Sequence, residues 1–466
     1  MLQVINPATG ELLREFPEDT AESVAKKFSK AQQAQPAWAA LPGDARREAL
    51  VAFRNMLLEK RDELGATLTS ETGKPIRQSL SEISTTAERL DFFVDNFAAV
   101  IAPDEVFRYP SEATPDPQGP TLEERITYEP LGVIANISAW NFPYFVGTNV
   151  IAPALLTGNA VLYKPSELAT STGLLVTEML HRAGVPKDVF QAVVGGPEAG
   201  RLVLEQELGG VFFTGSHDTG VQIAARAAVG MMRIQLELGG KDPVYVCEDI
   251  NVEAVAASVA DGAFYNTGQS CCAVERVYVH KRLYKPFLEA FVECVKAFTV
   301  GDPSDEKTFV GPVARPGQLE ALQHQVQDAL EKGASVVLGG EPVEGPGRFF
   351  APTILVNVDH TMSVMRDESF GPVIGIKEVA NDAEAISLMN DTRYGLTAAV
   401  YTRDGNRARK ILGALQTGTV YWNCCDRISP RLPWTGRKHS GVGSTLSVLG
   451  IRAFVTPKAW HLKSVC

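Results

Sequence analysis

The amino-acid sequence predicts an α/β protein with a first domain built on a parallel, doubly wound sheet and a second domain that is also α/β. The chain has 466 residues, which is long for a single hydrophobic core. Apolar runs of strand length alternate with helical segments up to about residue 238, and a second alternation follows from residue 239. Such alternation is typical of doubly wound sheets with helices on both faces, in which ligands bind beyond the carboxyl ends of the strands.

Composition and charge exclude several classes of partner. Hydrophobic residues make up 45% of the chain and charged residues 21%, as in ordinary globular proteins. The net charge of -11 disfavours nucleic acids and anionic membranes, because neither attracts an acidic surface. The longest apolar stretch, Val146–Leu162, is interrupted by glycine, proline and asparagine and is too broken to span a bilayer.

The cysteines and the start of the chain favour a cytoplasmic protein. Seven cysteines are an odd number, and two pairs are adjacent in sequence, at 271/272 and 424/425. This is no disulfide framework, and a reducing compartment fits it better. The Met1–Pro7 start has no basic region, apolar core or Arg/Ser-rich presequence, so we expect no targeting signal.

The N-terminal part is expected to be mainly helical after short strands around a turn at residues 6–10, all within residues 1–16. Five prolines between residues 102 and 120 predict a connector, and Arg125–Glu129 alternates like an exposed strand. The predicted helices are Thr20–Ala40, a helix that Asp44 opens and residues 71–75 stop, and a helix over about Ser81–Val100.

The next block has the most regular pattern in the chain. Its predicted strands are Val133–Ile137, Ala160–Tyr163, Phe190–Val194, Val211–Phe213 and Ile234–Leu236. Its predicted helices are Tyr144–Leu156, Thr170–Ala183, Pro197–Leu204 and Thr219–Val229. In the second block we expect strands near Val244, Val277, Val336, Pro352–Val356, Ile374, Ala398 and Val420. Its expected helices lie near Val252–Ala263, Tyr284–Phe298, Gly317–Lys332, Asp382–Asn390 and Gly405–Leu415.

Two adjacent thiols, Cys271 and Cys272, follow the small and polar residues Gly268, Gln269 and Ser270. A flexible backbone can approach a bound ligand closely, and a thiol placed there can act as a nucleophile. The alternative is that both cysteines are small buried hydrophobic residues.

Two further polar residues follow predicted strands. The side-chain amide of Asn141 can stabilise an oxyanion, although an Asx turn before Pro143 explains it equally well. Glu237 ends an apolar strand, where burial can shift the pKa of a carboxylate towards the value that suits a general base. The alternative for Glu237 is a buried ion pair with Lys241.

Other strand ends offer candidate binding groups. Lys164 and Glu167 could contact ribose hydroxyls, although a surface ion pair is the better explanation of this motif when it is taken alone. Gly215 and Ser216 precede a predicted helix, whose N-terminus favours a phosphate, yet their spacing fits a plain strand-to-helix turn as well. We find no Cys/His metal spacing and expect no metal.

Taken together, the motifs of this chain resemble those of the aldehyde dehydrogenase superfamily from end to end. The motifs, in family order, are Asn141-Phe142-Pro143, Lys164-Pro-Ser-Glu167, Phe213-Thr-Gly-Ser216, Glu237-Leu-Gly-Gly-Lys241, Gly268-Gln-Ser-Cys271, Glu368-Ser-Phe-Gly-Pro372 and Ser440-Gly-Val-Gly443.

The resemblance implies catalytic roles for three residues. Cys271 would be the nucleophile and Cys272 its non-catalytic neighbour. Asn141 would hold the oxyanion together with the backbone N–H of Cys271, and Glu237 would activate water as the general base. The chain departs from many relatives at Thr445, where they carry a glutamate near the water path.

The resemblance also implies NAD as cofactor, with NADP possible. Glu167 would repel a 2′-phosphate, which favours NAD, and Ser166 could soften that preference. The implied cofactor-binding residues are Lys164 and Glu167 at the adenosine ribose, Gly215 and Ser216 at the pyrophosphate, Glu368 and Phe370 at the nicotinamide half, and also Trp140 and Leu238.

The implied reaction is the oxidation of an aldehyde to a carboxylic acid through a thioester on Cys271. A mostly apolar pocket favours a medium aliphatic or aromatic aldehyde; its implied residues are Phe142, Val146, Asn149, Tyr265, Ile428 and Trp434. Arg427 and Arg431 are near in sequence and leave a semialdehyde as an alternative. A catalytically silent binding protein is a second alternative, which the presence of all three catalytic residue types disfavours.

The resemblance finally implies the division of the chain and its assembly. A Rossmann-like dinucleotide-binding domain would comprise residues 1–106 and 131–238, and a catalytic domain residues 239–436. A small β oligomerisation arm would comprise residues 107–130 and 437–466, in a homodimer or homotetramer.

Overall fold

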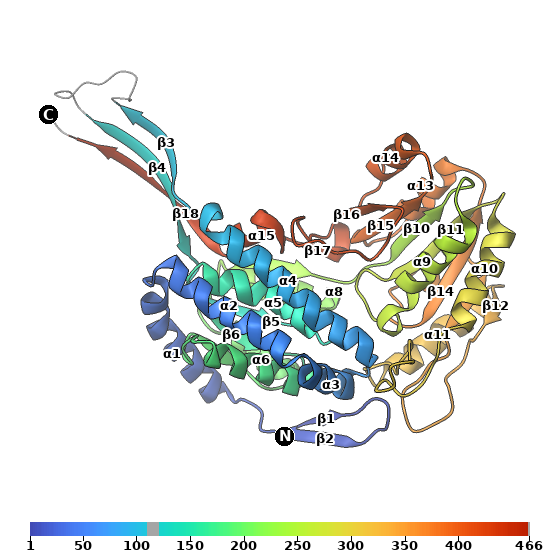
Figure 1. Ribbon diagram of the computed structural model, residues 1–466, viewed down its shortest axis with the longest axis horizontal. Coiled ribbons are helices and arrows are strands. Elements are labelled where there is room, and N and C mark those ends of the chain that lie inside the picture. Colours follow the sequence, from blue (N-terminus) through green and yellow to red (C-terminus); the bar gives the residue numbers. More distant parts are fainter. Residues whose placement is uncertain (110–120, 465–466) are drawn as a thin grey trace.

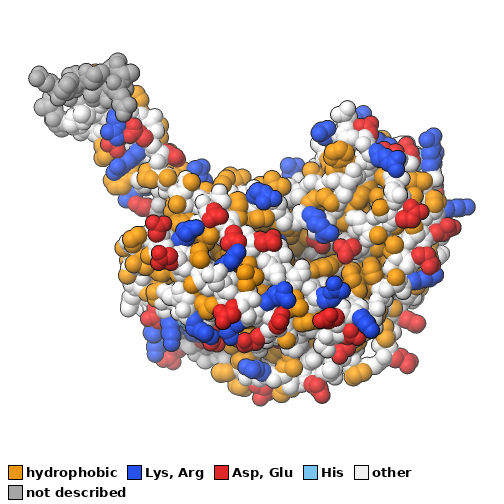
Figure 2. All heavy atoms as spheres, viewed as in Figure 1, with side chains coloured by type: hydrophobic (Ala, Val, Ile, Leu, Met, Phe, Trp, Pro, Cys, Tyr) orange, Lys and Arg blue, Asp and Glu red, His pale blue; other side chains and the backbone are white. Residues whose placement is uncertain are grey.

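The computed structural model of the protein describes residues 1–109 and 121–464. Two bodies, each built on its own mostly parallel sheet, lie side by side, and a narrow three-stranded sheet projects from one of them (Figure 1). The predicted α/β class is confirmed. Acidic and basic side chains are interspersed on the face shown in Figure 2. Among the helices of the described ranges, none combines the length and apolar character that crossing a bilayer requires.

The N-terminal elements begin with a small hairpin and continue as a layer of helices. The predicted helix from Asp44 to residues 71–75 is wrong in one respect, because it is broken at Lys60. The backbone of Lys60, with φ -99° and ψ 14°, leaves the helical region and ends one helix before the next begins. The elements are β1 (Leu2–Ile5), β2 (Leu12–Phe16), α1 (Ala21–Ala39), α2 (Gly43–Glu59), α3 (Arg61–Thr72) and α4 (Ile76–Val100).

The first large sheet has six strands in the order β17-β9-β8-β5-β6-β7. All its strands are parallel except β17, which pairs antiparallel with β9. The chain leaves the central strand β5 towards β6 on one side and later forms β8 on the other, so the topology switches between β5 and β8. The strands are β5 (Val133–Ile137), β6 (Ala160–Lys164), β7 (Phe190–Ala192), β8 (Gly210–Thr214), β9 (Arg233–Glu237) and β17 (Gly441–Val442).

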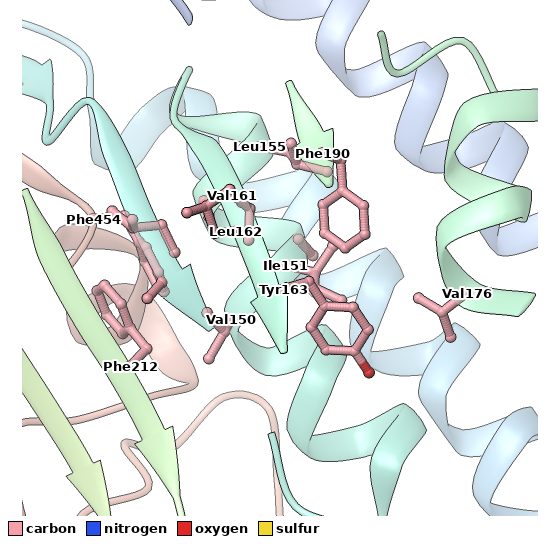
Figure 3. Packing of buried hydrophobic residues seen from close by; sticks show 14 of the residues in the cluster. Val150, Ile151, Leu155, Val161, Leu162, Tyr163, Val176, Phe190, Phe212 and Phe454 are labelled. Carbon is pink, nitrogen blue, oxygen red and sulfur yellow. The ribbon is translucent and has the colours of Figure 1, made fainter. Parts of the chain in front are cut away.

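Helices cover this sheet and bury a continuous core against it. Side chains of β6 and α5 interdigitate in this core, and Tyr163 lies against Phe190 with ring centroids 5.5 Å apart (Figure 3). Phe454, from the end of the chain, stacks on Phe212 of β8 at 4.1 Å. Besides α1–α4, which share this core, the helices of this body are α5 (Pro143–Leu156), η1 (Glu167–Ala169), α6 (Thr170–Arg182), α7 (Pro197–Leu204), α8 (His217–Val229), η3 (Lys438–Ser440) and α15 (Ser447–Arg452).

The second large sheet has seven strands in the order β12-β13-β14-β11-β10-β15-β16, and only β12 is antiparallel to its neighbour. Its strands are β10 (Asp242–Val246), β11 (Val274–His280), β12 (Ser335–Leu338), β13 (Thr353–Val356), β14 (Val373–Val379), β15 (Thr397–Tyr401) and β16 (Thr419–Trp422). Its helices are α9 (Val252–Phe264), η2 (Tyr265–Gly268), α10 (Tyr284–Lys296), α11 (Gln318–Glu331), α12 (Ser363–Arg366), α13 (Asp382–Asn390) and α14 (Gly405–Gly413).

The projecting sheet consists of β3 (Asp104–Tyr109), β4 (Leu122–Pro130) and β18 (Val455–Lys463), all antiparallel. The strand β3 lies inside the stretch that the prolines predict to be a connector, and no alternation in its sequence indicates a strand. The segment is a strand because it forms an antiparallel ladder with β4. The prolines at positions 110, 115, 117 and 120 lie outside the described residues.

Candidate active site

The loop that carries Cys271 is held in an unusual backbone conformation. Asn266 and Thr267 have positive φ angles of 52° and 59°, which non-glycine residues rarely adopt. Hydrogen bonds fix both residues: Asn266 donates its backbone N–H to Gln78 Oε1 at 2.8 Å, and the Thr267 hydroxyl accepts the N–H of Gly311 at 3.0 Å. The thiol that follows is therefore presented from a pinned loop.

The structure distinguishes the two adjacent thiols. Cys271 is partly exposed in a cavity, whereas Cys272 is buried in the core and its Sγ lies 2.9 Å from Asp426 Oδ1. A hydrogen bond with the Cys271 thiol, together with burial, raises the pKa of Cys272 well above its ordinary value. Because attack requires a thiolate, this environment disfavours Cys272 as a nucleophile.

Asn141 contacts the same loop from the other sheet. The side-chain Nδ2 of Asn141 donates to the backbone carbonyl of Gln269 at 3.1 Å. The backbone carbonyl of Asn141 accepts from Asn266 Nδ2 at 3.2 Å. The side chain of Asn141, which follows a strand of the first sheet, is thus hydrogen-bonded to the cysteine loop of the second body. It does not form an Asx turn before Pro143. One of the two amide hydrogens of Asn141 remains for a further acceptor in the cavity.

A buried ion pair fixes the segment that follows Asn141. Glu82 of α4 accepts the N–H groups of Tyr144 and Phe145 at the start of α5, at 2.9 and 3.3 Å. A carboxylate is favourable at this helix end. Lys74 pairs with Glu82 and lies 3.7 Å from the centroid of the Phe142 ring. These contacts orient the residues that follow Asn141.

Glu237 ends β9 and is buried. Its Oε1 accepts hydrogen bonds from the Thr445 hydroxyl and, at 3.1 Å, from Gln235 Nε2. Burial raises the pKa of Glu237 to about 7, against the opposing effect of these donors. The expected alternative, an ion pair with Lys241, is not formed, because Lys241 binds Glu275 at 2.5 Å.

Two glycines allow the motifs to meet. A Cβ at Gly240 would collide with the carbonyl oxygen of Cys271, so glycine is required where the strand end after Glu237 passes the nucleophile loop. Gly441 has a φ of 135°, and a Cβ there would meet the backbone of Leu236. This close approach forms β17 and carries Thr445 to Glu237.

The three predicted catalytic residues share one cavity of about 770 Å³. All six residues expected to contact the substrate also line it, namely Phe142, Val146, Asn149, Tyr265, Ile428 and Trp434. The cavity therefore joins Cys271, Asn141 and Glu237, which are far apart in the sequence, around a space large enough for a small organic molecule.

The residues expected to bind the cofactor gather at the carboxyl ends of four parallel strands. This is the edge at which the sheet topology switches, where such sheets bind nucleotides. Trp140 follows β5, Lys164 ends β6, Gly215 and Ser216 follow β8, and Leu238 follows β9.

The adenosine side of this edge carries a helix start and an ion pair. Ser216 caps the N-terminus of α8, whose free N–H groups and dipole favour a phosphate. Lys164 is buried and pairs with the half-exposed Glu167 at 3.3 Å, so a simple surface ion pair does not describe it. Burial lowers the pKa of Lys164.

The opposite side carries a carboxylate and two aromatic rings. Glu368 accepts the N–H of Gly240 at 2.9 Å, and burial raises the pKa of Glu368 to about 8. Phe370 meets Trp140 edge to face, with ring centroids 5.7 Å apart. Glu275 accepts the N–H group of Phe370 at 2.9 Å and so fixes this loop. A helix start for a pyrophosphate, carboxylates for ribose hydroxyls and aromatic rings for a flat base together fit a nicotinamide dinucleotide.

Sequence reasoning missed three residues at this site. Asp426 and Arg89 line the cavity, and Glu275 neutralises Lys241. Arg89 could have been noticed in the sequence. It follows Thr86 by three positions and precedes Phe93 by four, which places it on the buried face of α4. A charged residue on that face needs an explanation. No cluster of three or more metal-ligating side chains occurs within residues 1–109 and 121–464.

Comparisons with known proteins agree with this geometry. The family model described as "Aldehyde dehydrogenase family" matches residues 1–460. The chain is 34% identical over 455 residues to the succinate-semialdehyde dehydrogenase [NADP(+)] of Deinococcus radiodurans, covering 97% of this chain and 93% of that one. It is 34% identical over 466 residues to the chloroplastic betaine aldehyde dehydrogenase of Amaranthus hypochondriacus, covering 98% and 92%.

A solved structure gives the same result. The crystal structure of lactaldehyde dehydrogenase from Escherichia coli superposes with a TM-score of 0.93 at 33% identity, covering 99% of this chain and 95% of that one. The chain therefore belongs to the aldehyde dehydrogenase family of NAD(P)-dependent oxidoreductases.

Proposed function

We propose that this enzyme oxidises an aldehyde to the carboxylic acid through a covalent adduct on Cys271. The observation that carries the proposal is the convergence of Cys271, Asn141 and Glu237 on one cavity, beside the strand edge that fits a dinucleotide. Each residue type there is suited to one requirement of the reaction: a nucleophile, an oxyanion donor and a base.

The first step is the addition of the Cys271 thiolate to the aldehyde carbon, which turns the carbonyl oxygen into an oxyanion. The free amide hydrogen of Asn141 and the backbone N–H of Cys271 donate to that oxygen. Because Asn141 is already tied to Gln269 at 3.1 Å, its donor needs little reorganisation when charge develops. NAD(P)⁺, when bound, supplies the hydride acceptor, so that collapse of the oxyanion leaves a thioester on Cys271.

The second step is hydrolysis of this thioester. Glu237, whose pKa of about 7 is close to neutral pH, removes a proton from the attacking water. The Thr445 hydroxyl donates to Glu237 and therefore supports its ionised form. Release of the acid regenerates the thiol.

NAD is the proposed preferred cofactor. Glu167 is half-exposed at the end of the second strand of the sheet, where its carboxylate would repel a 2′-phosphate. Its pairing with Lys164 weakens that repulsion, so use of NADP at lower efficiency is expected.

The test combines two variants with an aldehyde panel that is run with NAD and with NADP. Cys271→Ala should abolish nicotinamide reduction with every aldehyde, because no other thiol replaces it. Cys272→Ala is the matched control and should retain turnover. Full activity of Cys271→Ala would overturn the proposal.

We also infer a homodimer or homotetramer in a reducing compartment such as the cytoplasm. The projecting sheet exposes large apolar side chains, among them Val106, Phe107 and Tyr109, which a second copy would cover. The cysteines of the described part of the chain are all free. Sedimentation analysis measures the assembly state.

A further inference from the structure

Arg89 is a buried cation in the wall of the substrate cavity. It lies on α4, is only 3% exposed and lines the same cavity as Cys271. Its Nη1 donates to Asn149 Oδ1 at 3.4 Å, and the guanidinium lies 3.7 Å from the centroid of the Phe145 ring. Its Nε is buried without a hydrogen-bond partner, and Arg89 forms no ion pair with any residue that the structure describes.

Such a state is unfavourable for a folded protein. A buried charge is normally paired with an opposite charge, and a buried N–H group normally has an acceptor. Burial lowers the pKa of Arg89 to about 10, which keeps the guanidinium charged at neutral pH. The stacking on Phe145 compensates only part of the lost hydration.

The three carboxyl groups that act on Arg89 through space are engaged elsewhere. Glu82 pairs with Lys74 and caps α5, and Glu237 accepts from Thr445. Asp426 accepts from the Cys272 thiol. Each is near enough to act on Arg89 through space, yet none forms an ion pair with it.

We propose that Arg89 binds a carboxylate at the far end of the aldehyde, so that the substrate is an ω-oxo acid. This inference rests on the proposed aldehyde oxidation and assigns its substrate class. Arg89 lines the cavity, and a guanidinium fork matches the two oxygens of a carboxylate. The surrounding carboxylates disfavour a doubly charged phosphate in the same place.

The assignment chooses among chemically different aldehydes. A cationic aldehyde would place its charge near Arg89 and be repelled, and a neutral one would leave the guanidinium unpaired. Arg431, which the sequence offered as an anchor, lies exposed at the edge of the cavity and is a weaker candidate because water screens its charge.

The experiment measures kcat/KM for ω-oxo acids of increasing chain length against alkanals of matching length, using the full-length enzyme with saturating NAD. The wild type should prefer the oxo acids. In Arg89→Gln, the ratio of oxo-acid to alkanal efficiency should fall about 100-fold, the usual order for removing one partner of a buried charge pair. Arg431→Gln removes the same charge from the exposed edge and should leave the ratio at its wild-type value.

Two outcomes would overturn the inference. One is a wild type that oxidises alkanals or amino aldehydes as efficiently as oxo acids. The other is an Arg89→Gln variant that loses both activities equally, which would make Arg89 a structural residue. If no aldehyde of any class reacted, the proposed function itself would fail, so the two failures are distinguishable.

A second measurement needs no variant at Arg89 and covers the case in which Arg89→Gln does not fold. Dicarboxylates should inhibit alkanal oxidation by the wild type competitively, with an optimum in chain length, whereas diamines of the same length should not. Absence of dicarboxylate inhibition at every length would also refute the role of Arg89.

Discussion

Replacing Thr445 by valine removes the hydroxyl that donates to Glu237 and keeps a side chain of nearly the same volume. The hydroxyl stabilises the ionised carboxylate, so its loss should raise the pKa of Glu237. A hydrogen bond to a charged group contributes about 1.5–3 kcal/mol. Since one pKa unit corresponds to about 1.4 kcal/mol, we expect an upward shift of about one to two units.

The starting point for this shift is a pKa of about 7. At pH 7 the ionised fraction of Glu237 should then fall from about one half to about one tenth or less. Where hydrolysis limits turnover, kcat should fall by about fivefold or more at pH 7 and recover at higher pH.

The assay is the pH dependence of steady-state nicotinamide reduction under saturating substrate. In Thr445→Val, the rising limb of the pH–rate profile should move to higher pH. The amplitude of the first turnover should remain, because Cys271 is unchanged. Thr445→Ser keeps the hydroxyl and should retain the wild-type limb. A limb that does not move in the valine variant, or that moves equally in the serine variant, would refute the assignment of Thr445 as a donor to the base.

Further predictions concern the base and the cofactor. Glu237→Gln should retain a first-turnover burst but slow the steady state by about 100-fold, the usual scale for a general base, and loss of the burst in rapid mixing would contradict a role confined to hydrolysis. The folded state raises the pKa of Glu237 from 4.5 to about 7, so this residue lowers the stability of the wild type progressively as pH rises through that window. Glu237→Gln should therefore unfold at higher denaturant concentration than the wild type at pH 8 and at a similar one at pH 4.5; equal midpoints at pH 8 would argue against the raised pKa. Glu167→Gln should narrow the preference for NAD over NADP, and an unchanged ratio of the two kcat/KM values would exclude its ribose role.

Much of the architecture was readable from local signals. Buried parallel strands are short continuous apolar runs, so the predicted Val133–Ile137 and Ile234–Leu236 coincide with β5 and β9 to within one residue. The family, the α/β class and the use of NAD(P) are confirmed by the comparisons. Short motifs identify the family because the geometry of each segment allows few residue types. At Gly240, for example, any side chain would collide with the carbonyl oxygen of Cys271.

The remaining features depend on contacts between distant segments. The resemblance places Thr445 near the water path, but its hydrogen bond to Glu237 could not be predicted, because the antiparallel pairing of β17 with β9 creates that contact. The strand β3 exists through its partner β4 and has no alternation of its own. The orientation of Arg89 depends on which face of α4 packs against α5. A helical pattern in the sequence predicts a buried face but does not identify the element that covers it.

The hydrogen bond between Thr445 and Glu237 also sets the time at which the active site can be completed during synthesis. The two residues are 208 positions apart in the chain. A ribosome that adds about 5–20 residues per second needs roughly 10–40 s to translate that distance. Throughout this interval the nascent chain already contains the base and, soon after it, the nucleophilic thiol, but lacks the donor that stabilises the ionised base. In the proposed mechanism, full hydrolytic efficiency at neutral pH is thus deferred until residue 445 has been synthesised.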